Sequence, residues 1–168
     1  DPVLDSDLAG RFYYNSLTVM NSTFSCDVFR SNSGGRVWDD GAFARGGDKQ
    51  WMTIDKIGGP GNGNIYASWT SSWSECFPGF FTRSANRGAS YENCTVIPGD
   101  PLWGSLAVGP NRELYVCGAG DTSFIVAKST NASNVGESVS WDTTTVVNRD
   151  GEVSAFPGSS SPNPGGLR

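Results

Sequence analysis

Residues 84–91 read Ser84-Ala85-Asn86-Arg87-Gly88-Ala89-Ser90-Tyr91, and this stretch decides the fold because it recurs along the chain. An upstream copy from Ser31 to Trp38 keeps the serine first, a glycine fifth and an aromatic residue eighth. A looser downstream copy extends from Ser129 to Trp141, with extra residues in the middle. The three serines lie 53 and 45 positions apart, and a repeat of this period indicates an architecture built from similar units.

The recurring stretch has the composition of a tight hairpin turn. A short polar side chain at the third position can bond the backbone of the turn, and the glycine can take a positive φ angle. The closing aromatic residue is expected to pack the turn onto its sheet. The residues in these roles are Ser31, Ser33, Gly35 and Trp38, then Ser84, Asn86, Gly88 and Tyr91, and finally Ser129, Asn131 and Trp141.

The frame resembles the Asp-box, Ser-x-Asp-x-Gly-x-Thr-Trp, of the sialidase-like β-propellers, also called the bacterial neuraminidase repeat. All three copies depart from it at the third position, where Ser33, Asn86 and Asn131 replace the aspartate. The run from Asp48 through Trp69 also resembles Asp-Lys-Pro-Trp…Gly-Asn-Val-Tyr-Val-Ser-Trp segments of such proteins, with Gln50 in place of the proline. The resemblance implies an all-β fold, namely a β-propeller of four-stranded antiparallel blades. About three blades are implied, so the ring is incomplete, because propellers typically close with 4–8 blades.

Strand-like runs separated by turn residues divide the chain into three units, at about residues 1–47, 48–99 and 100–147. Asp48 and Asp100 are expected at matching positions ahead of the first strands of the second and third units. Residues 148–168 have the Gly/Pro/Ser-rich composition of a linker into a possible next blade. The expected strands include residues 10–19, 27–30, 48–55, 64–70, 80–83, 91–97, 103–108, 113–117, 124–128 and 139–147.

Composition excludes several classes of function. The 168-residue chain is long enough for one domain with a sizeable core, and its net charge of −5 argues against a nucleic-acid-binding surface. It contains no histidine, which rules out Ser-His-Asp and Cys-His catalysis and His-ligated metals. No apolar run reaches the roughly 18 residues of a membrane-spanning helix. We expect no signal peptide, since the Asp1-Pro2 start is typical of a mature or trimmed end.

The cysteines and sequons favour an exported protein. Cys26, Cys76, Cys94 and Cys117 lack the close-paired spacing of zinc ligands, so no metal site is expected. Cys76 precedes the strand that enters the second serine turn and Cys94 lies in the strand that leaves it. We therefore predict a Cys76–Cys94 disulfide, for which residues 76–79 must curl back. N-glycosylation sequons begin at Asn21, Asn93 and Asn131.

The resemblance places the ligand pocket on the rim opposite the Asp-box turns. Family sialidases hold a substrate carboxylate with three arginines and use an aspartate acid/base and a tyrosine nucleophile paired with glutamate. Asp27, just before the first turn, is the nearest match to the acid/base, while the Arg-Ile-Pro motif of the family is absent. The alternative is that the rim carboxylates cap turns and bond backbone amides. The substrate-binding candidates on this rim are Arg45, Asp48, Lys49, Trp73, Glu75, Asp100 and Asp121.

Two functional hypotheses follow. The first is an extracellular or cell-surface sialidase-like propeller that binds or hydrolyses glycan, with a carbohydrate partner, no nucleic acid, no membrane span and no cofactor. The second is a non-catalytic structural or interaction module of a surface or multi-chain assembly. Three blades leave the outer faces of the first and third without a neighbour. Further blades are therefore expected, either from the same protein or from copies of this chain.

Overall fold

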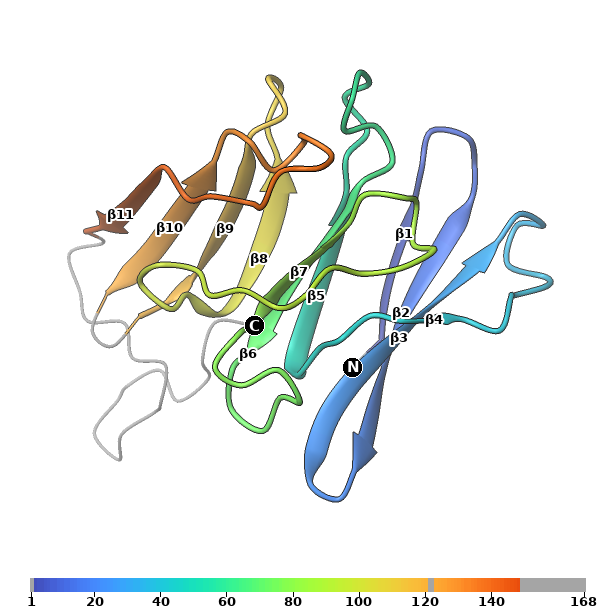
Figure 1. Cartoon of the computed structure of the whole chain (residues 1–168), viewed down its shortest axis with the longest axis horizontal. Helices are drawn as coiled ribbons and strands as arrows, with labels where there is room; N and C mark the ends of the chain where they lie inside the picture. The colour runs from blue at the N-terminus through green and yellow to red at the C-terminus, as the bar shows by residue number, and fades with distance from the viewer. Residues whose placement is uncertain (1, 121–122, 149–168) are drawn as a thin grey trace.

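The computed structural model describes residues 2–120 and 123–148, which form three antiparallel β-sheets and no helix (Figure 1). The all-β prediction is confirmed, and the described residues offer no long apolar helix that could cross a membrane. The strands are β1 (Val3–Ser6), β2 (Phe12–Met20), β3 (Thr23–Ser31), β4 (Ala42–Phe43), β5 (Asp48–Ile54), β6 (Ile65–Thr70), β7 (Phe81–Ser84), β8 (Leu102–Val108), β9 (Leu114–Ala119), β10 (Phe124–Ser129) and β11 (Thr143–Val147).

Each sheet is a simple meander in which neighbouring strands follow one another in the sequence. Sheet 1 has the order β1-β2-β3-β4, sheet 2 the order β5-β6-β7, and sheet 3 the order β8-β9-β10-β11. Each sheet lies within one of the three units expected from the repeat. Strand β5 packs against both β1 and β8, so the first strands of the three sheets are neighbours and the sheets fan out from them (Figure 1).

Sheet 2 has three strands, which corrects the expectation of four strands in every unit. Residues 91–97 form one isolated bridge, in which Thr95 pairs with Phe81. The segment bonds to β7 at two separate points, Glu92 N to Arg83 O and Thr95 N to Phe81 O, and no continuous ladder forms between them. Strand β1, which pairs with β2 through residues 3–6, is also absent from the sequence-based expectation. A four-residue strand carries little periodicity.

Strands β5 and β8 carry equivalent bulges, and these correct another expectation. Each bulge has one extra residue at positive φ, namely Lys49 (57°) and Trp103 (51°). In the resulting register Asp48 pairs with Thr70, and Leu102 pairs with Ala119. Asp48 and Leu102 thus occupy equivalent positions in their sheets. Asp100 therefore lies before the ladder, and the expectation that Asp48 and Asp100 match is wrong.

The core consists of two apolar clusters. Strand alternation sends successive side chains to opposite faces, and the larger cluster contains both Tyr66 and Ala67, so it reaches both faces of sheet 2. The cluster between sheets 1 and 2 contains Tyr13, Val28, Ala44, Met52, Ile54 and Ile65. The larger cluster around sheets 2 and 3 contains Tyr66, Ala67, Trp69, Phe80, Phe81, Ile97, Leu106, Leu114, Val116, Ala127 and Ala132.

The three serine turns, Ser31–Trp38, Ser84–Tyr91 and Ser129–Trp141, share one hydrogen-bond pattern. In each, the third-position side-chain oxygen accepts the backbone N–H that precedes the aromatic residue, and the residue after the aromatic donates its N–H to the carbonyl before the serine. The first bonds are Val37 N to Ser33 Oγ (2.7 Å), Ser90 N to Asn86 Oδ1 (2.9 Å) and Ser140 N to Asn131 Oδ1 (2.9 Å). The second are Asp39 N to Arg30 O (3.0 Å), Glu92 N to Arg83 O (2.9 Å) and Asp142 N to Lys128 O (2.8 Å).

Each sheet also carries a tyrosine directly opposite the basic residue that precedes its serine turn. We call these the tyrosine–cation pairs: Tyr13 with Arg30, Tyr66 with Arg83, and Tyr115 with Lys128. The serine turn of sheet 2 docks on the pair of sheet 1, and the serine turn of sheet 3 docks on the pair of sheet 2. Tyr66 Oη, for example, donates to the carbonyl of Ala132 in the third turn (3.1 Å). The pairs were missed in the sequence, although a basic residue before the serine is present in every copy.

Replacing Gly88 by valine is expected to lower the free energy of unfolding by about 1–3 kcal/mol. Gly88 has a φ of 76°, and an added Cβ would lie 3.2 Å from Ile65 and 3.4 Å from Tyr13, between two sheets. Gly34→Val is the matched control, because Gly34 has a φ of 67° with nothing within 4 Å of an added Cβ. Urea unfolding of both variants separates backbone strain from crowding, and equal losses would show that crowding contributes nothing.

Candidate functional site

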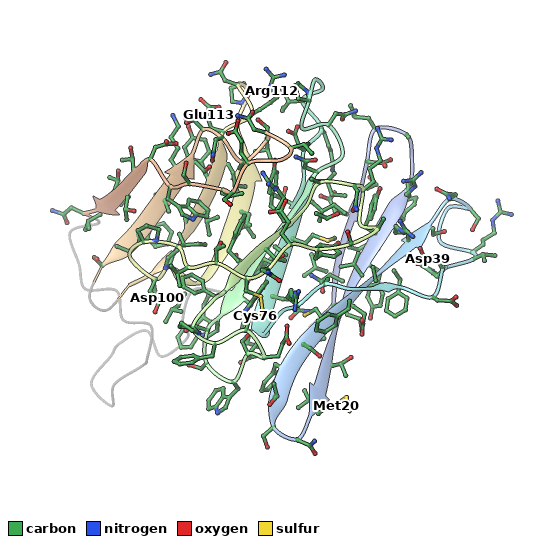
Figure 2. All side chains as sticks on the ribbon, viewed as in Figure 1. Met20, Asp39, Cys76, Asp100, Arg112 and Glu113 are labelled. Carbon is green, nitrogen blue, oxygen red and sulfur yellow. A yellow bond between two sulfur atoms is a disulfide. The ribbon has the colours of Figure 1, made fainter. Side chains whose placement is uncertain are left out.

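The loop rim consists of residues 44–49, 71–80 and 96–101, at the ends of the strands remote from the serine turns. Because β6 and β7 are antiparallel, the loop that joins them lies at the opposite end from Ser84. Figure 2 shows Cys76 and Asp100 at this end of the molecule and Arg112 and Glu113 at the other. The loop rim is therefore where most of the predicted substrate-binding residues lie.

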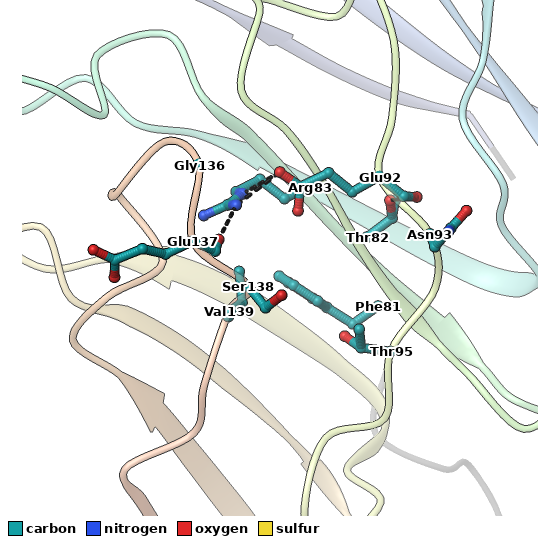
Figure 3. A pocket seen from close by; sticks show the side chains of 10 residues that line it. All are labelled: Phe81, Thr82, Arg83, Glu92, Asn93, Thr95, Gly136, Glu137, Ser138 and Val139. Carbon is teal, nitrogen blue, oxygen red and sulfur yellow. Dashed lines mark hydrogen bonds and ion pairs between the residues drawn. The ribbon is translucent and has the colours of Figure 1, made fainter.

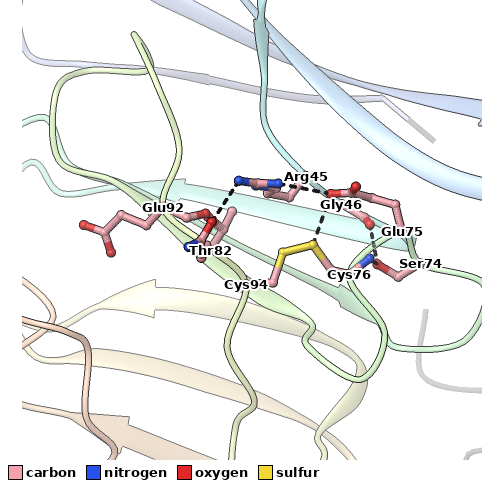
Figure 4. The surroundings of a disulfide bond; sticks show 9 residues. Arg45, Gly46, Ser74, Glu75, Cys76, Thr82, Glu92 and Cys94 are labelled. Carbon is pink, nitrogen blue, oxygen red and sulfur yellow. Dashed lines mark hydrogen bonds and ion pairs between the residues drawn. A yellow bond between two sulfur atoms is a disulfide. The ribbon is translucent and has the colours of Figure 1, made fainter.

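Arg45 and Glu75 are brought together on the loop rim (Figure 4). Arg45 Nη1 lies 3.8 Å from Glu75 Oε1, and Arg45 Nη2 donates to Asn93 Oδ1 at 3.0 Å. The guanidinium carbon also lies 5.5 Å from the centroid of the Phe43 ring. Arg45 thus links sheet 1 to the loops of sheet 2, and its charge is already paired within the chain.

The loop with Trp73 is held to sheet 1 by backbone bonds. Phe24 N donates to Trp73 O (2.8 Å) and Glu75 N donates to Phe24 O (3.1 Å). The buried Ser74 hydroxyl donates to Gly46 O at 2.6 Å. The Trp73 side chain is exposed, with its ring centroid 6.4 Å from that of Phe24. The backbone is thereby held in place and leaves an aromatic surface on the rim.

The predicted Cys76–Cys94 disulfide is confirmed (Figure 4). The curl expected for residues 76–79 is present, since Gly79 N donates to Cys76 O at 2.7 Å. Gly79 is required here, because an added Cβ would lie 2.8 Å from Cys94 Cβ. The Glu75 carboxylate and both sulfurs lie within 4.8 Å of one another. Both sulfurs are consumed by the disulfide, and a metal needs a free thiolate, so this cluster is no metal site.

The rim groove is a cavity of about 550 Å³ between the loop 71–80 and residues 96–102. Its surface is somewhat more apolar than polar, with an exposed aromatic ring at Phe77, and Asp100 is the only ionisable residue among the described residues that line it. Among the described residues, Asp100 is also the one predicted rim residue that contributes to it. The lining residues are Ser71, Phe77, Pro78, Phe80, Val96, Ile97, Gly99, Asp100, Leu102 and Gly120.

A second cavity of about 390 Å³ lies between sheets 2 and 3 beside Arg83 (Figure 3). The Arg83 Nε and Nη2 atoms donate to Glu92 Oε1, at 2.9 and 2.7 Å. Its Nη1 donates to Ala132 O and Asn134 O, and Nη2 also donates to Glu137 O. All five N–H groups of the guanidinium are thus used within the protein, and none remains for a ligand.

Other predicted residues lie away from the rim groove. Asp27 stands in β3, opposite Ser16 and Phe43, between the buried Cys26 and Val28. Strand alternation therefore places its side chain on the outer face of sheet 1. Asp48 starts β5, Lys49 is exposed at the bulge, and Asp121 lies outside the described residues.

The three sequons differ in how their asparagines are used. Asn21 is exposed in the β2–β3 hairpin turn, with a φ of 51°. Asn93 is exposed, and its Oδ1 accepts from Arg45. Asn131 Nδ2 donates to Ser138 O at 3.0 Å inside the third serine turn. A glycan on Asn131 would replace one of the two hydrogens on the Nδ2 that makes this bond, whereas the structure gives the Asn21 side chain an exposed position.

Strained backbone conformations gather on the loop rim. Non-glycine residues with positive φ are uncommon, and such strain is found preferentially at functional sites. Four of them lie on the rim as defined, and Trp103 follows in the bulge of β8. Their φ angles are 64° for Arg45, 57° for Lys49, 59° for Trp73, 47° for Asp100 and 51° for Trp103.

No family model matches the chain, and no curated protein matches it. Among solved structures, it resembles a crystal structure of a protein of unknown function from Dyadobacter fermentans DSM 18053, with a TM-score of 0.51 and 17% identity. The match covers 84% of this chain and 50% of that one, so the chain spans about half the length of that structure. At this identity the likeness concerns the fold alone.

Proposed function

We propose that the chain forms three blades of a sialidase-like β-propeller and that its loop rim binds a neutral saccharide. Three features support the propeller: meander sheets in chain order, first strands that lie side by side, and serine turns with a shared hydrogen-bond pattern. On this proposal the three Asp-box-like serine turns have a structural role. The second and third turns dock on the preceding sheet, and the opposite rim is left for ligands.

The observation that carries the binding proposal is the composition of the rim groove. Ligand sites are typically concave and apolar, with a few polar groups that set orientation. The exposed Phe77 ring offers an apolar face for a sugar ring, and the polar residues Ser71 and Asp100 also line the groove. The adjacent Trp73 extends the aromatic surface.

The charge of the groove favours a neutral sugar over an acidic one. A carboxylate ligand is best held by arginine in a bidentate pair, and the only ionisable residue among the described lining residues is an acid. On the loop rim as defined, Arg45 is the single arginine, and Glu75 lies beside it. Sialidase chemistry needs three arginines and a tyrosine–glutamate pair, so binding is better supported than hydrolysis for the described residues.

An exported location belongs to the same proposal. The disulfide is consistent with an oxidising compartment, where free carbohydrate and glycosylated surfaces are also found. A non-catalytic interaction module remains compatible with this rim, because sugar binding needs no reaction.

Phe77→Ala is expected to weaken binding of neutral oligosaccharides about tenfold, equal to about 1.4 kcal/mol. The measurement is calorimetric titration with a panel of neutral and sialylated oligosaccharides. Leu8→Ala is the control, because Leu8 is 68% exposed, Phe77 is 71% exposed, and Leu8 lies outside the loop rim. Binding of sialylated sugars alone, or equal affinities for the two variants, would contradict the proposal.

A further inference from the structure

The outer face of sheet 3 carries the residues that in the other two sheets are covered by the next sheet. Two opposed pairs define this face, Tyr115 with Lys128 and Cys117 with Val126, and all four are partly exposed. The equivalent residues of sheet 2 are buried at 7% exposure or less, and those of sheet 1 are buried apart from Arg30. These equivalents are Tyr66, Arg83, Ser68 and Phe81 in sheet 2, and Tyr13, Arg30, Asn15 and Val28 in sheet 1.

The outer face of sheet 1 carries the opposite half of this contact, because it has a serine turn but no preceding sheet in the described residues. Val37, at the tip of this turn, is 69% exposed. Beside the turn, the Tyr14 ring lies 6.1 Å from Phe29 and 6.0 Å from Trp38, and all three are partly exposed. The residues of sheets 2 and 3 equivalent to Tyr14 and Phe29 are buried, namely Ala67, Thr82, Val116 and Ala127, whereas Tyr91 and Trp141, the equivalents of Trp38, are partly exposed as Trp38 is.

The two outer faces are thus the two halves of a junction that occurs twice inside the chain. One half is a tyrosine–cation pair, and the other is a serine turn with backbone carbonyls to accept hydrogen bonds. In the junction between sheets 2 and 3, Tyr66 and Arg83 donate to such carbonyls. In sheet 1, Tyr13 Oη donates to Asp7 and Arg30 Nε donates to Asp39. Tyr115 and Lys128 lie in the same register and also carry donors, and Lys128 Nζ lies 3.7 Å from Glu113 Oε1 in its own sheet.

We propose that the outer face of sheet 3 docks on the serine turn and aromatic cluster of sheet 1 in a second copy of this chain. Two copies related by a two-fold axis then form two identical junctions and close a ring of six sheets, within the 4–8 typical of propellers. The described exposed aromatic and aliphatic side chains at both faces become buried in this assembly. The proposal is independent of sugar binding at the loop rim.

Light scattering of the full chain tests the assembly over concentrations from about 1 to about 100 µM. The expected mass is twice the 17.9 kDa of one chain. Cys117 provides a second readout, because it lies on the docking face and is a free cysteine. Its labelling by a maleimide is expected to slow at least about tenfold as the dimer forms. Cys26 is buried, and burial raises the pKa of its thiol to about 12, so it contributes little to labelling.

Val37→Glu is expected to raise the dimer dissociation constant at least about tenfold, because it buries a carboxylate in the junction. Val96→Glu is the matched control, since Val96 is 53% exposed and belongs to the segment that follows sheet 2, away from both outer faces. A wild-type mass of 17.9 kDa at every concentration would overturn the proposal. Open-ended oligomers would overturn the closed ring, and equal dissociation constants for the two variants would overturn the assigned faces.

Discussion

Arg83→Met is expected to lower the free energy of unfolding by about 3–5 kcal/mol, because three backbone carbonyls lose their donor at about 1–3 kcal/mol each, while Glu92, 41% exposed, stays solvated. The Arg83 side chain is 1% exposed and donates to Glu92 and to the carbonyls of Ala132, Asn134 and Glu137. Methionine fills part of the volume but donates to none of these groups. The loss is a large fraction of the 5–15 kcal/mol typical of a domain, so the junction between sheets 2 and 3 is expected to open first.

The equivalent positions in the other sheets supply matched controls for Arg83. Arg30 pairs with Asp39 at 2.6 Å, but both side chains are about one-third exposed, at 32% and 33%. Burial alone would raise the pKa of the Asp39 carboxyl, yet the hydrogen bonds from Arg30 leave it below its usual value. A pair this exposed is worth about 0–1 kcal/mol, so Arg30→Met should cost little.

Urea unfolding monitored by tryptophan fluorescence compares the two arginine variants directly. The prediction requires Arg83→Met to cost several times as much as Arg30→Met. Arg83→Lys is expected to fall between them, because lysine keeps the charge but lacks the planar fork that reaches both Glu92 and the serine-turn carbonyls. Similar losses for Arg83→Met and Arg30→Met would show that the buried network adds no stability.

Replacing both disulfide cysteines, Cys76→Ser with Cys94→Ser, is expected to cost roughly 3 kcal/mol. The bond closes a loop with a sequence separation of 18, and its loss frees the unfolded chain as well as residues 76–79. Those residues include Phe77 and Pro78 in the rim groove, so saccharide affinity should fall together with stability.

Chemical reduction provides the control for the disulfide prediction. A reductant should destabilise the wild type by the same amount as the double replacement and leave the double variant unchanged. Peptide mapping without reductant should recover Cys76 and Cys94 as one linked pair. A free thiol on either cysteine, or an equal effect of reductant on both proteins, would contradict the assignment.

The repeat in the sequence was sufficient to predict the three sheets, the serine turns and the disulfide. Each of these depends on residues close together in the chain: Ser84 and Asn86 bond within their own turn, and Cys76 and Cys94 flank one hairpin. Local hydrogen bonds and short loops leave a signal in residue type and spacing, which is why the turn at residues 84–91 could be recognised. The propeller ring, its blade count and its sugar remain proposals built on that pattern.

Tertiary structure alone decided how the three sheets pack together and where the rim groove lies. The Arg83 network joins residues about 50 positions apart, and its carbonyl acceptors belong to backbone that any residue type could supply. The bulge at Lys49 shifts the register, so Asp48 and Asp100 separate although their spacing in the sequence looks equivalent. The rim groove likewise depends on two loops from different sheets. Packing between distant segments depends on their shapes and on the direction of their backbone groups. Neither property can be read from residue type or spacing.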